Sequence, residues 1–287
     1  MCPAKRKKKW INEVVFLDLL QNRLSLLRDN FVVNWHEHVW EKAPGVIDRE
    51  ECDGLVQGAH DTGMDQVLVS CPVVYERYCS PERQRIANDV IIEAVKLYPD
   101  ILRGMCFVNP GNGDASCDEI ERCVTEHGMV GIKMYHHYFI DDPVQYKIIE
   151  KCIDLDIPIL VHAGKLCFDP MSQPHVSNGI HFANIAARYP EAHFIMAHIT
   201  GGGDWQWSLK AIEHSPNVVT DISGSVCDAG VIEETIRYLG VDRVLWGTDG
   251  SISAGVGKII AADIPEEDKK KILAGAPYRR FLERGRA

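Results

Sequence analysis

The sequence has no apolar run long enough to cross a bilayer. A membrane helix needs about 20 consecutive apolar residues, and charged residues interrupt the apolar runs of this chain well before that length. A secretory leader is not expected either, because the basic run at residues 5–9 is followed by a segment in which Glu13 and Asp18 break the apolar pattern. We therefore expect neither a membrane nor a secreted protein, but a cytoplasmic one.

Paired cysteine motifs are also missing, although the chain contains ten cysteines. No CxxC spacing occurs, and several cysteines lie inside apolar segments, such as Cys71 in VLVSC and Cys106 in GMCFV. This usage is typical of buried, reduced thiols rather than of a disulfide framework. No base is evident beside Cys71, so thiol catalysis is not expected.

Positive charge is scarce as well. Acidic residues outnumber basic ones by 41 to 31, which gives a net charge of −10. Nucleic-acid binding usually needs a basic stripe, which such a body lacks. The basic run KRKKK at residues 5–9 is interpreted as a solvated tail, with a nucleic-acid or localisation patch as the alternative. The expected partner is a small-molecule substrate, without nucleic acid or membrane, and a homodimer is left open.

What the chain does contain is a regular alternation of strand-like and helix-like segments. Runs such as PILV at 158–161 are apolar on successive residues, which is typical of parallel strands covered on both faces. Eight strands are predicted, at 30–36, 66–72, 102–110, 130–137, 158–164, 193–199, 217–223 and 243–249. Helices are predicted at 81–97, 115–127, 143–155, 178–189, 204–214, 229–239 and after Pro265. The weakest helix prediction lies between the first two strands, where only a short piece is periodic.

Eight such units predict an α/β fold, a (β/α)8 TIM barrel with parallel strands, rather than an open doubly wound sheet. No GxGxxG follows the first strand, which argues against a dinucleotide-binding fold. The glycine-rich segment GSISAGVGKII lacks the GK[ST] ending of a phosphate loop. Residues 28–287 are predicted to form the barrel. Residues 1–27 are predicted to be a short helical appendage that covers its bottom.

Histidines and acids gather where the predicted strands end, which is where barrel enzymes carry their active sites. His36 and His38 lie two apart on the first strand, so both side chains point to one face while Glu37 points to the other. Closure of the barrel would bring Asp249, after the eighth strand, beside this pair. His162, after the fifth strand, would lie across the lumen.

Three imidazoles and one carboxylate predict a divalent-metal site made of His36, His38, His162 and Asp249. One Zn²⁺ suits these donors best, and Mn²⁺ or Fe²⁺ is compatible with them. Such an ion would activate a water, and His198 and Asp249 would move its protons. Each residue also has an ordinary alternative: His162 as a hydrogen-bonded structural histidine, Asp249 as a helix cap. Their conjunction favours the metal.

The motifs HxH, VHAG, AHITGG and WGTDG, in this order, resemble the amidohydrolase superfamily, specifically its branch of aminocarboxymuconate-semialdehyde decarboxylase-like proteins. The resemblance covers about residues 31–250. It implies a TIM barrel, the same four metal ligands and His198 as the catalytic histidine. The chain departs from the pattern at Asn34, where members usually have Asp. It also departs at the final helix, which reads GAPYRRFL where members often have GNAxRLF.

Lys133 on the fourth strand has three interpretations. In some amidohydrolases this lysine is carbamylated and bridges a second metal, with His198 as a further ligand. The alternatives are an ion pair with a neighbouring carboxylate or a contact to a substrate carboxylate. His137 and Trp205 are weaker substrate-binding candidates, and packing is the more common role of an aromatic residue placed like Trp205. Asp221 could support a metal ligand or tie a loop, and the loop is favoured.

The leading functional hypothesis is a metal-dependent hydrolase that acts on a small carboxylate-bearing or cyclic substrate, a lactone, amide or ester. The alternative is a nonoxidative decarboxylase or hydratase that uses the same site. A phosphoesterase or TatD-like nuclease is disfavoured for two reasons. TatD-like barrels carry a carboxylate on the fourth strand, whereas VGIKMYHH at 130–137 has none, and an acidic chain repels polyanionic substrates. A non-catalytic barrel is disfavoured because all four ligand types are present.

Overall fold

The structure is a computed structural model that describes residues 24–73, 76, 79–164, 173–199 and 201–283. Its centre is one eight-stranded parallel sheet, in which the strands follow one another in chain order apart from a small hairpin. The strands are β1 (Val33–His38), β4 (Gln66–Ser70), β5 (Leu102–Phe107), β6 (Gly131–Met134), β7 (Pro158–Val161), β8 (His193–Met196), β9 (Val218–Asp221) and β10 (Val244–Leu245).

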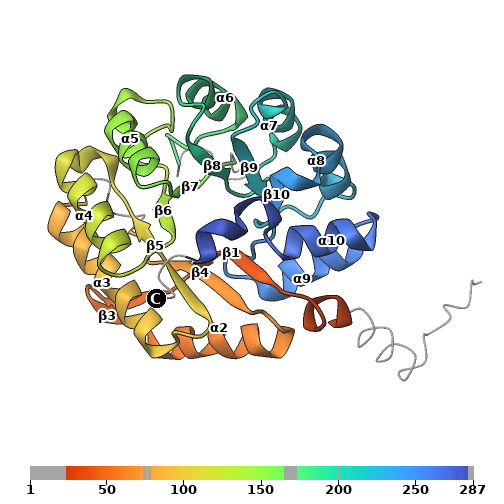
Figure 1. The fold of residues 1–287 in the computed structure, drawn as a ribbon, viewed down its shortest axis with the longest axis horizontal. Helices are drawn as coiled ribbons and strands as arrows, with labels where there is room; N and C mark the ends of the chain where they lie inside the picture. The colour runs from red at the N-terminus through yellow and green to blue at the C-terminus, as the bar shows by residue number, and fades with distance from the viewer. Residues whose placement is uncertain (1–23, 74–75, 77–78, 165–172, 200, 284–287) are drawn as a thin grey trace, which may run out of the picture.

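Hydrogen bonds between the first and last strands close this sheet. The Trp35 N–H donates to the Trp246 carbonyl at 2.9 Å, and the Asp249 N–H donates to the His36 carbonyl at 2.8 Å. Figure 1 shows the strands as a ring with the helices around it. The (β/α)8 barrel predicted from the sequence is confirmed, and each of the eight predicted strands corresponds to one of these.

The helices cover the outside of the barrel, as their buried apolar stripes require. Most match the predicted ranges closely. They are α2 (Arg49–Thr62), α3 (Pro81–Leu97), α4 (Asp114–Thr125), α5 (Tyr146–Asp154), α6 (Gly179–Arg188), α7 (Trp205–Ile212), α8 (Val231–Leu239), α9 (Ile252–Ala261) and α10 (Glu266–Leu273). Helix α9 and the hairpin of β2 (Glu41–Ala43) and β3 (Val46–Ile47) were not predicted.

Helix α2 is longer than its sequence suggested. The Asp48 side chain accepts from the Glu51 N–H at its start, and Gly63 ends it in the left-handed conformation. Its buried face consists of Cys52, Val56 and Ala59, which are small or moderately apolar residues. The helical periodicity of this segment is weak in the sequence because only these few small residues form its apolar face. The capping residues at its two ends define its limits more clearly.

The barrel interior is filled by apolar side chains that alternate with outward-facing ones along each strand, among them Val33, Leu68 and Leu160. At the bottom, the C-terminal 3-10 segment (Ala276–Glu283) inserts Tyr278 and Phe281 into the same cluster. The Tyr278 hydroxyl donates to the Phe194 carbonyl at 3.2 Å. The segment at 276–283 therefore closes this end of the barrel.

Of the predicted N-terminal appendage, residues 24–28 are helical, while the basic run at 5–9 lies outside the described residues. No helix in the described ranges is long and apolar enough to span a membrane. The cysteines in these ranges are all free thiols, and six of them are buried. This agrees with the prediction of reduced, packed cysteines.

Candidate metal centre

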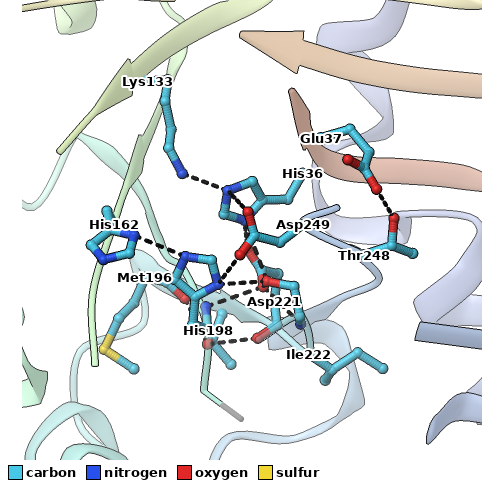
Figure 2. A network of polar contacts seen from close by, with 12 residues as sticks. His36, Glu37, Lys133, His162, Met196, His198, Asp221, Ile222, Thr248 and Asp249 are labelled. Carbon is cyan, nitrogen blue, oxygen red and sulfur yellow. Dashed lines mark hydrogen bonds and ion pairs between the residues drawn. The ribbon is translucent and has the colours of Figure 1, made fainter. Parts of the chain in front are cut away.

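Four of the five residues predicted for the metal centre lie together in Figure 2: His36, His162, His198 and Asp249. The fifth, His38, joins them through a contact to Asp249. His36 and His38 come from β1, His162 directly follows β7, His198 follows β8, and Asp249 follows β10. The alternation of β1 points both of its histidines toward the barrel mouth. His36 is 1% exposed and His198 is 4% exposed, so the centre lies largely out of solvent.

The Asp249 carboxylate lies at the middle of this group. Its Oδ1 is 2.9 Å from His38 Nε2 and 3.6 Å from His36 Nε2, and its Oδ2 is 3.5 Å from His198 Nδ1. One ligand atom from each of His36, His198 and Asp249 lies within 4.8 Å of the others, close enough to hold one metal ion. His198, predicted as the catalytic residue, is therefore also within reach of a metal at this point.

His162 joins the group through His198. Its Nδ1 is 3.1 Å from His198 Nε2. Its other ring nitrogen, Nε2, is buried and makes no hydrogen bond with the described residues. A buried, unpaired nitrogen is costly unless something binds it. The donors thus fit a divalent cation: imidazoles with an available nitrogen, and a carboxylate among them.

Asp221, at the end of β9, supports the centre from below. Its Oδ2 is 2.9 Å from His36 Nδ1, so His36 turns its Nε2 toward Asp249. Its Oδ1 accepts from the backbone N–H groups of His198, at 3.1 Å, and Ser223, at 2.9 Å. The Ser223 hydroxyl in turn lies 2.8 Å from His198 Nδ1. Of the two interpretations of Asp221, the less favoured one, support of a metal ligand, fits its contact with His36. Ser223 was missed as a partner of His198.

The pKa values of these groups favour metal binding. Burial lowers the pKa of His38 to about 4 and that of His198 to about 3. Burial alone would raise the pKa of Asp249, but the neighbouring His198 and His36 hold it well below its usual range. At neutral pH His38 and His198 are thus neutral imidazoles and Asp249 is an ionised carboxylate, the protonation states that bind metals.

Lys133, on β6, is fully buried and points into the barrel toward His36 (Figure 2). Its Nζ lies 2.5 Å from His36 Nε2 and 4.9 Å from the centre of the Tyr135 ring. Burial lowers the pKa of Lys133 to about 8, although Asp249 and Asp221 oppose this shift. Its ammonium is therefore a positive group directly beside the predicted ligands.

The structure places the two other substrate-binding candidates less favourably. His137 is buried with its ring centre 6.1 Å from that of Phe107. Its neighbour His136 instead lies against His162, at 5.6 Å between ring centres. Trp205 begins α7, is 8% exposed and donates its indole N–H to Asp228 at 2.9 Å. These contacts indicate packing for Trp205 and a position nearer the centre for His136 than for His137.

Two of the site residues have an unusual backbone conformation. His198 has φ 60° and Asp249 has φ 46°, a left-handed region that residues other than glycine seldom adopt. Glycines make room beside them. A Cβ at Gly201 would lie 2.4 Å from His198 Cβ, and one at Gly247 would lie 2.9 Å from His36 Cβ. Such strain is concentrated at functional sites, where the surrounding structure maintains it.

Comparisons with known proteins agree with this geometry. The model of the amidohydrolase family matches residues 75–281. The chain is 23% identical to a 2-amino-3-carboxymuconate-6-semialdehyde decarboxylase of Dictyostelium discoideum, over 73% of this chain and 70% of that protein. It is 27% identical to a 2-keto-4-carboxy-3-hexenedioate hydratase of Sphingobium sp. (strain NBRC 103272 / SYK-6), over 42% of this chain and only 41% of that protein.

Solved structures share the fold. One is a dihydroxybenzoic acid decarboxylase from Polaromonas sp. JS666 with bound manganese and an inhibitor. It has a TM-score of 0.67 and 19% identity, and the match covers 88% of this chain and 97% of that one. At 19% sequence identity, this similarity shows that the two proteins share the barrel fold and nothing further.

Proposed function

This chain belongs to the amidohydrolase family of enzymes, and we propose that it is a metal-dependent lyase that decarboxylates a small unsaturated carboxylic acid without an oxidant. The observation that carries the proposal is the convergence of His36, His198 and Asp249 on one point at the barrel mouth. The similarity to a decarboxylase over most of both chains supports decarboxylation. Hydrolysis, the leading hypothesis from the sequence, has less support, because the three similar proteins described above are named as two decarboxylases and a hydratase.

The proposed cofactor is one divalent ion, Zn²⁺ or Mn²⁺, held by His36, His38, His162 and Asp249. Nitrogen donors with a single carboxylate suit either ion, and manganese is bound in the dihydroxybenzoic acid decarboxylase. When bound, such an ion supplies Lewis-acid polarisation of an oxygen atom. The buried, unpaired Nε2 of His162 and the ionised Asp249 support this ligand set.

Lys133 and His198 have separate proposed roles in the reaction. Lys133 would bind a carboxylate of the substrate, because its ammonium is buried at the barrel mouth beside the ligands. Release of CO₂ breaks a C–C bond and leaves an electron pair on carbon, which must take up a proton. Solvent water would supply that proton, and His198 would pass it on through its Nδ1, which lies 2.8 Å from Ser223 Oγ and 3.5 Å from Asp249 Oδ2.

Hydration is the second candidate, and the 27% identity to a hydratase is the observation that favours it. The same residues would then deliver water to a carbon–carbon double bond, and no CO₂ would form. In both reactions the proposed partner is a small acid and not a nucleic acid.

An activity screen would test the proposal. The purified protein would be loaded with Mn²⁺ or Zn²⁺ and incubated with unsaturated dicarboxylic acids and hydroxybenzoates, while CO₂ release and ultraviolet absorbance are followed. We expect CO₂ release that a chelator abolishes. Loss of the double bond without CO₂ would favour the hydratase. Turnover of lactones, esters or amides alone would instead support the hydrolase.

A further inference from the structure

Glu37 is a buried acid between the two histidines of β1, yet its side chain points away from them (Figure 2). It is 3% exposed. Its carboxylate accepts three hydrogen bonds: one from the Thr248 hydroxyl, one from the Gly250 N–H at 2.9 Å and one from the His38 N–H at 3.3 Å. Two of these donors are the residues on either side of Asp249.

Asn34 completes the same group of contacts from the start of β1. Its Nδ2 donates to Thr248 Oγ1 at 2.7 Å. Its Oδ1 accepts from the backbone N–H groups of His36 and Thr248, both at 3.2 Å. The amide of Asn34 therefore donates to the Thr248 hydroxyl, which donates to Glu37. The direction of these bonds is fixed, because a hydroxyl has one proton to give.

We propose that Asn34, Thr248 and Glu37 form a positioning network that sets the orientation of His36, His38 and Asp249 toward the metal. The inference rests on the proposed function, because it assumes that those three residues bind the ion. The network bonds the backbone N–H groups of both histidines and of both neighbours of Asp249. It thereby maintains Asp249 at φ 46°, a conformation that costs free energy when left to itself.

The network also accounts for an amide, rather than a carboxylate, at position 34, because Asn34 both donates and accepts hydrogen bonds there. An aspartate cannot donate to Thr248, so the hydroxyl would have to choose between two acceptors. The side chains of positions 34 and 37 would then place two carboxylates around one proton in a buried site, where like charges repel strongly. Asn at 34 and Glu at 37 are therefore a matched pair in this chain.

Mn²⁺ affinity tests the proposal directly, measured by electron paramagnetic resonance of free Mn²⁺ during titration of the metal-free protein. We expect Glu37→Gln and Thr248→Val to raise the Kd about 10- to 100-fold, the usual effect of removing a residue that orients metal ligands. Thr248→Ser keeps the hydroxyl and should stay within about 3-fold of the wild type. The double variant should be no worse than the weaker-binding single variant, because both changes break one network.

The matched control is Glu119→Gln. Glu119 is a buried acid on α4, 6% exposed, that accepts from Asn88 and Arg122 away from the site. It should lower the melting temperature but leave the Kd for Mn²⁺ unchanged. If wild-type protein binds Mn²⁺ and Glu37→Gln and Thr248→Val bind it equally well, the inference is wrong. If the wild type itself binds none, the proposed function fails, and the inference fails with it.

Discussion

At the scale of the residue, His198 has a geometry that serves a proton relay. Its ring lies between His162 and Asp249, and its Nδ1 contacts the Ser223 hydroxyl at 2.8 Å. Its backbone has a φ of 60°, outside the range of a regular strand, and in this conformation the ring contacts both His162 and Asp249. Few residues other than glycine and asparagine adopt this φ readily. A substitution that tests the chemistry of His198 should therefore introduce a residue that accepts the same backbone conformation.

We therefore predict that His198→Asn lowers kcat by about 100- to 10,000-fold, the range for removal of a general acid or base. Metal content should stay near that of the wild type, because His198 is not among the four proposed ligands. Elemental analysis of the purified variant measures this, with His162→Ala as the comparison that should lose metal. Loss of metal from His198→Asn would make His198 a ligand.

At the scale of the element, helix α9 holds the Thr248 turn in place. The helix approaches so closely that a Cβ at Gly255 would lie 2.4 Å from the Thr248 methyl carbon. The indole of Trp246, just before the turn, donates to the Gly255 carbonyl at 3.1 Å. The helix that the sequence did not reveal is thus the one that packs against the residues around Asp249.

Gly255→Ala should consequently destabilise the protein by about 1 to 3 kcal/mol, the cost of forcing atoms into a packed contact. It should also weaken Mn²⁺ binding, because Thr248 would have to shift. Gly257→Ala in the same helix meets no atom within 4 Å. This control should be neutral or stabilising by up to about 1 kcal/mol, since alanine favours helices over glycine. Urea denaturation of both variants would measure the difference, and equal effects would contradict the packing argument.

At the scale of the whole molecule, the two ends of the barrel depend on different parts of the chain. The mouth carries the polar centre, while Tyr278 and Phe281 of the C-terminal segment close the bottom. Phe281 is 1% exposed, and its ring centre lies 5.3 Å from that of Tyr278. The 3-10 segment at 276–283 is thus part of the barrel core.

Phe281→Ala should cost about 3 to 5 kcal/mol in free energy of unfolding, the usual range for removing a buried phenylalanine. Trp207→Ala, at a tryptophan that is 70% exposed, should change it by no more than about 0.5 kcal/mol. Chemical denaturation of the two variants would show the contrast. A change of less than about 1 kcal/mol for Phe281→Ala would mean that the packing of residues 276–283 against the barrel contributes little to its stability.

The stability of the metal-free protein should fall as the pH falls from about 6.5 toward 4. Burial lowers the pKa of His38 to about 4 and of His198 to about 3, against about 6.5 in the unfolded chain. Between these values the unfolded state binds more protons, so acid favours unfolding, whereas the full stability is present above pH 6.5. Each histidine contributes up to about 1.4 kcal/mol per pH unit.

Urea midpoints of the chelated protein at pH 7.5 and 5 would measure this dependence. His198→Asn should reduce the slope, because one of the titrating groups is gone. A wild-type midpoint that does not change between these pH values would contradict the prediction.

The sequence by itself determined the barrel and most of its mouth. Apolar runs such as PILV are typical of strands that are covered on both faces, and their regular alternation with helices leaves few topologies. Closure then brings Asp249 beside the HxH pair of β1, and the structure confirms this proximity. The barrel could be predicted because hydrophobic periodicity is a local property of each segment. The proximity of Asp249 to β1 could be predicted because it follows from the order of the strands alone.

Only the tertiary structure decided which side chains support that mouth. The contact of Asp221 with His36 and the bonds of Glu37 to Thr248 and Gly250 join residues that lie 185 to 213 positions apart. Helix α9 and the placement of Phe281 at the bottom likewise depend on packing and not on pattern. No sequence period encodes such contacts, because each depends on where two distant backbones approach within a hydrogen bond's length of each other.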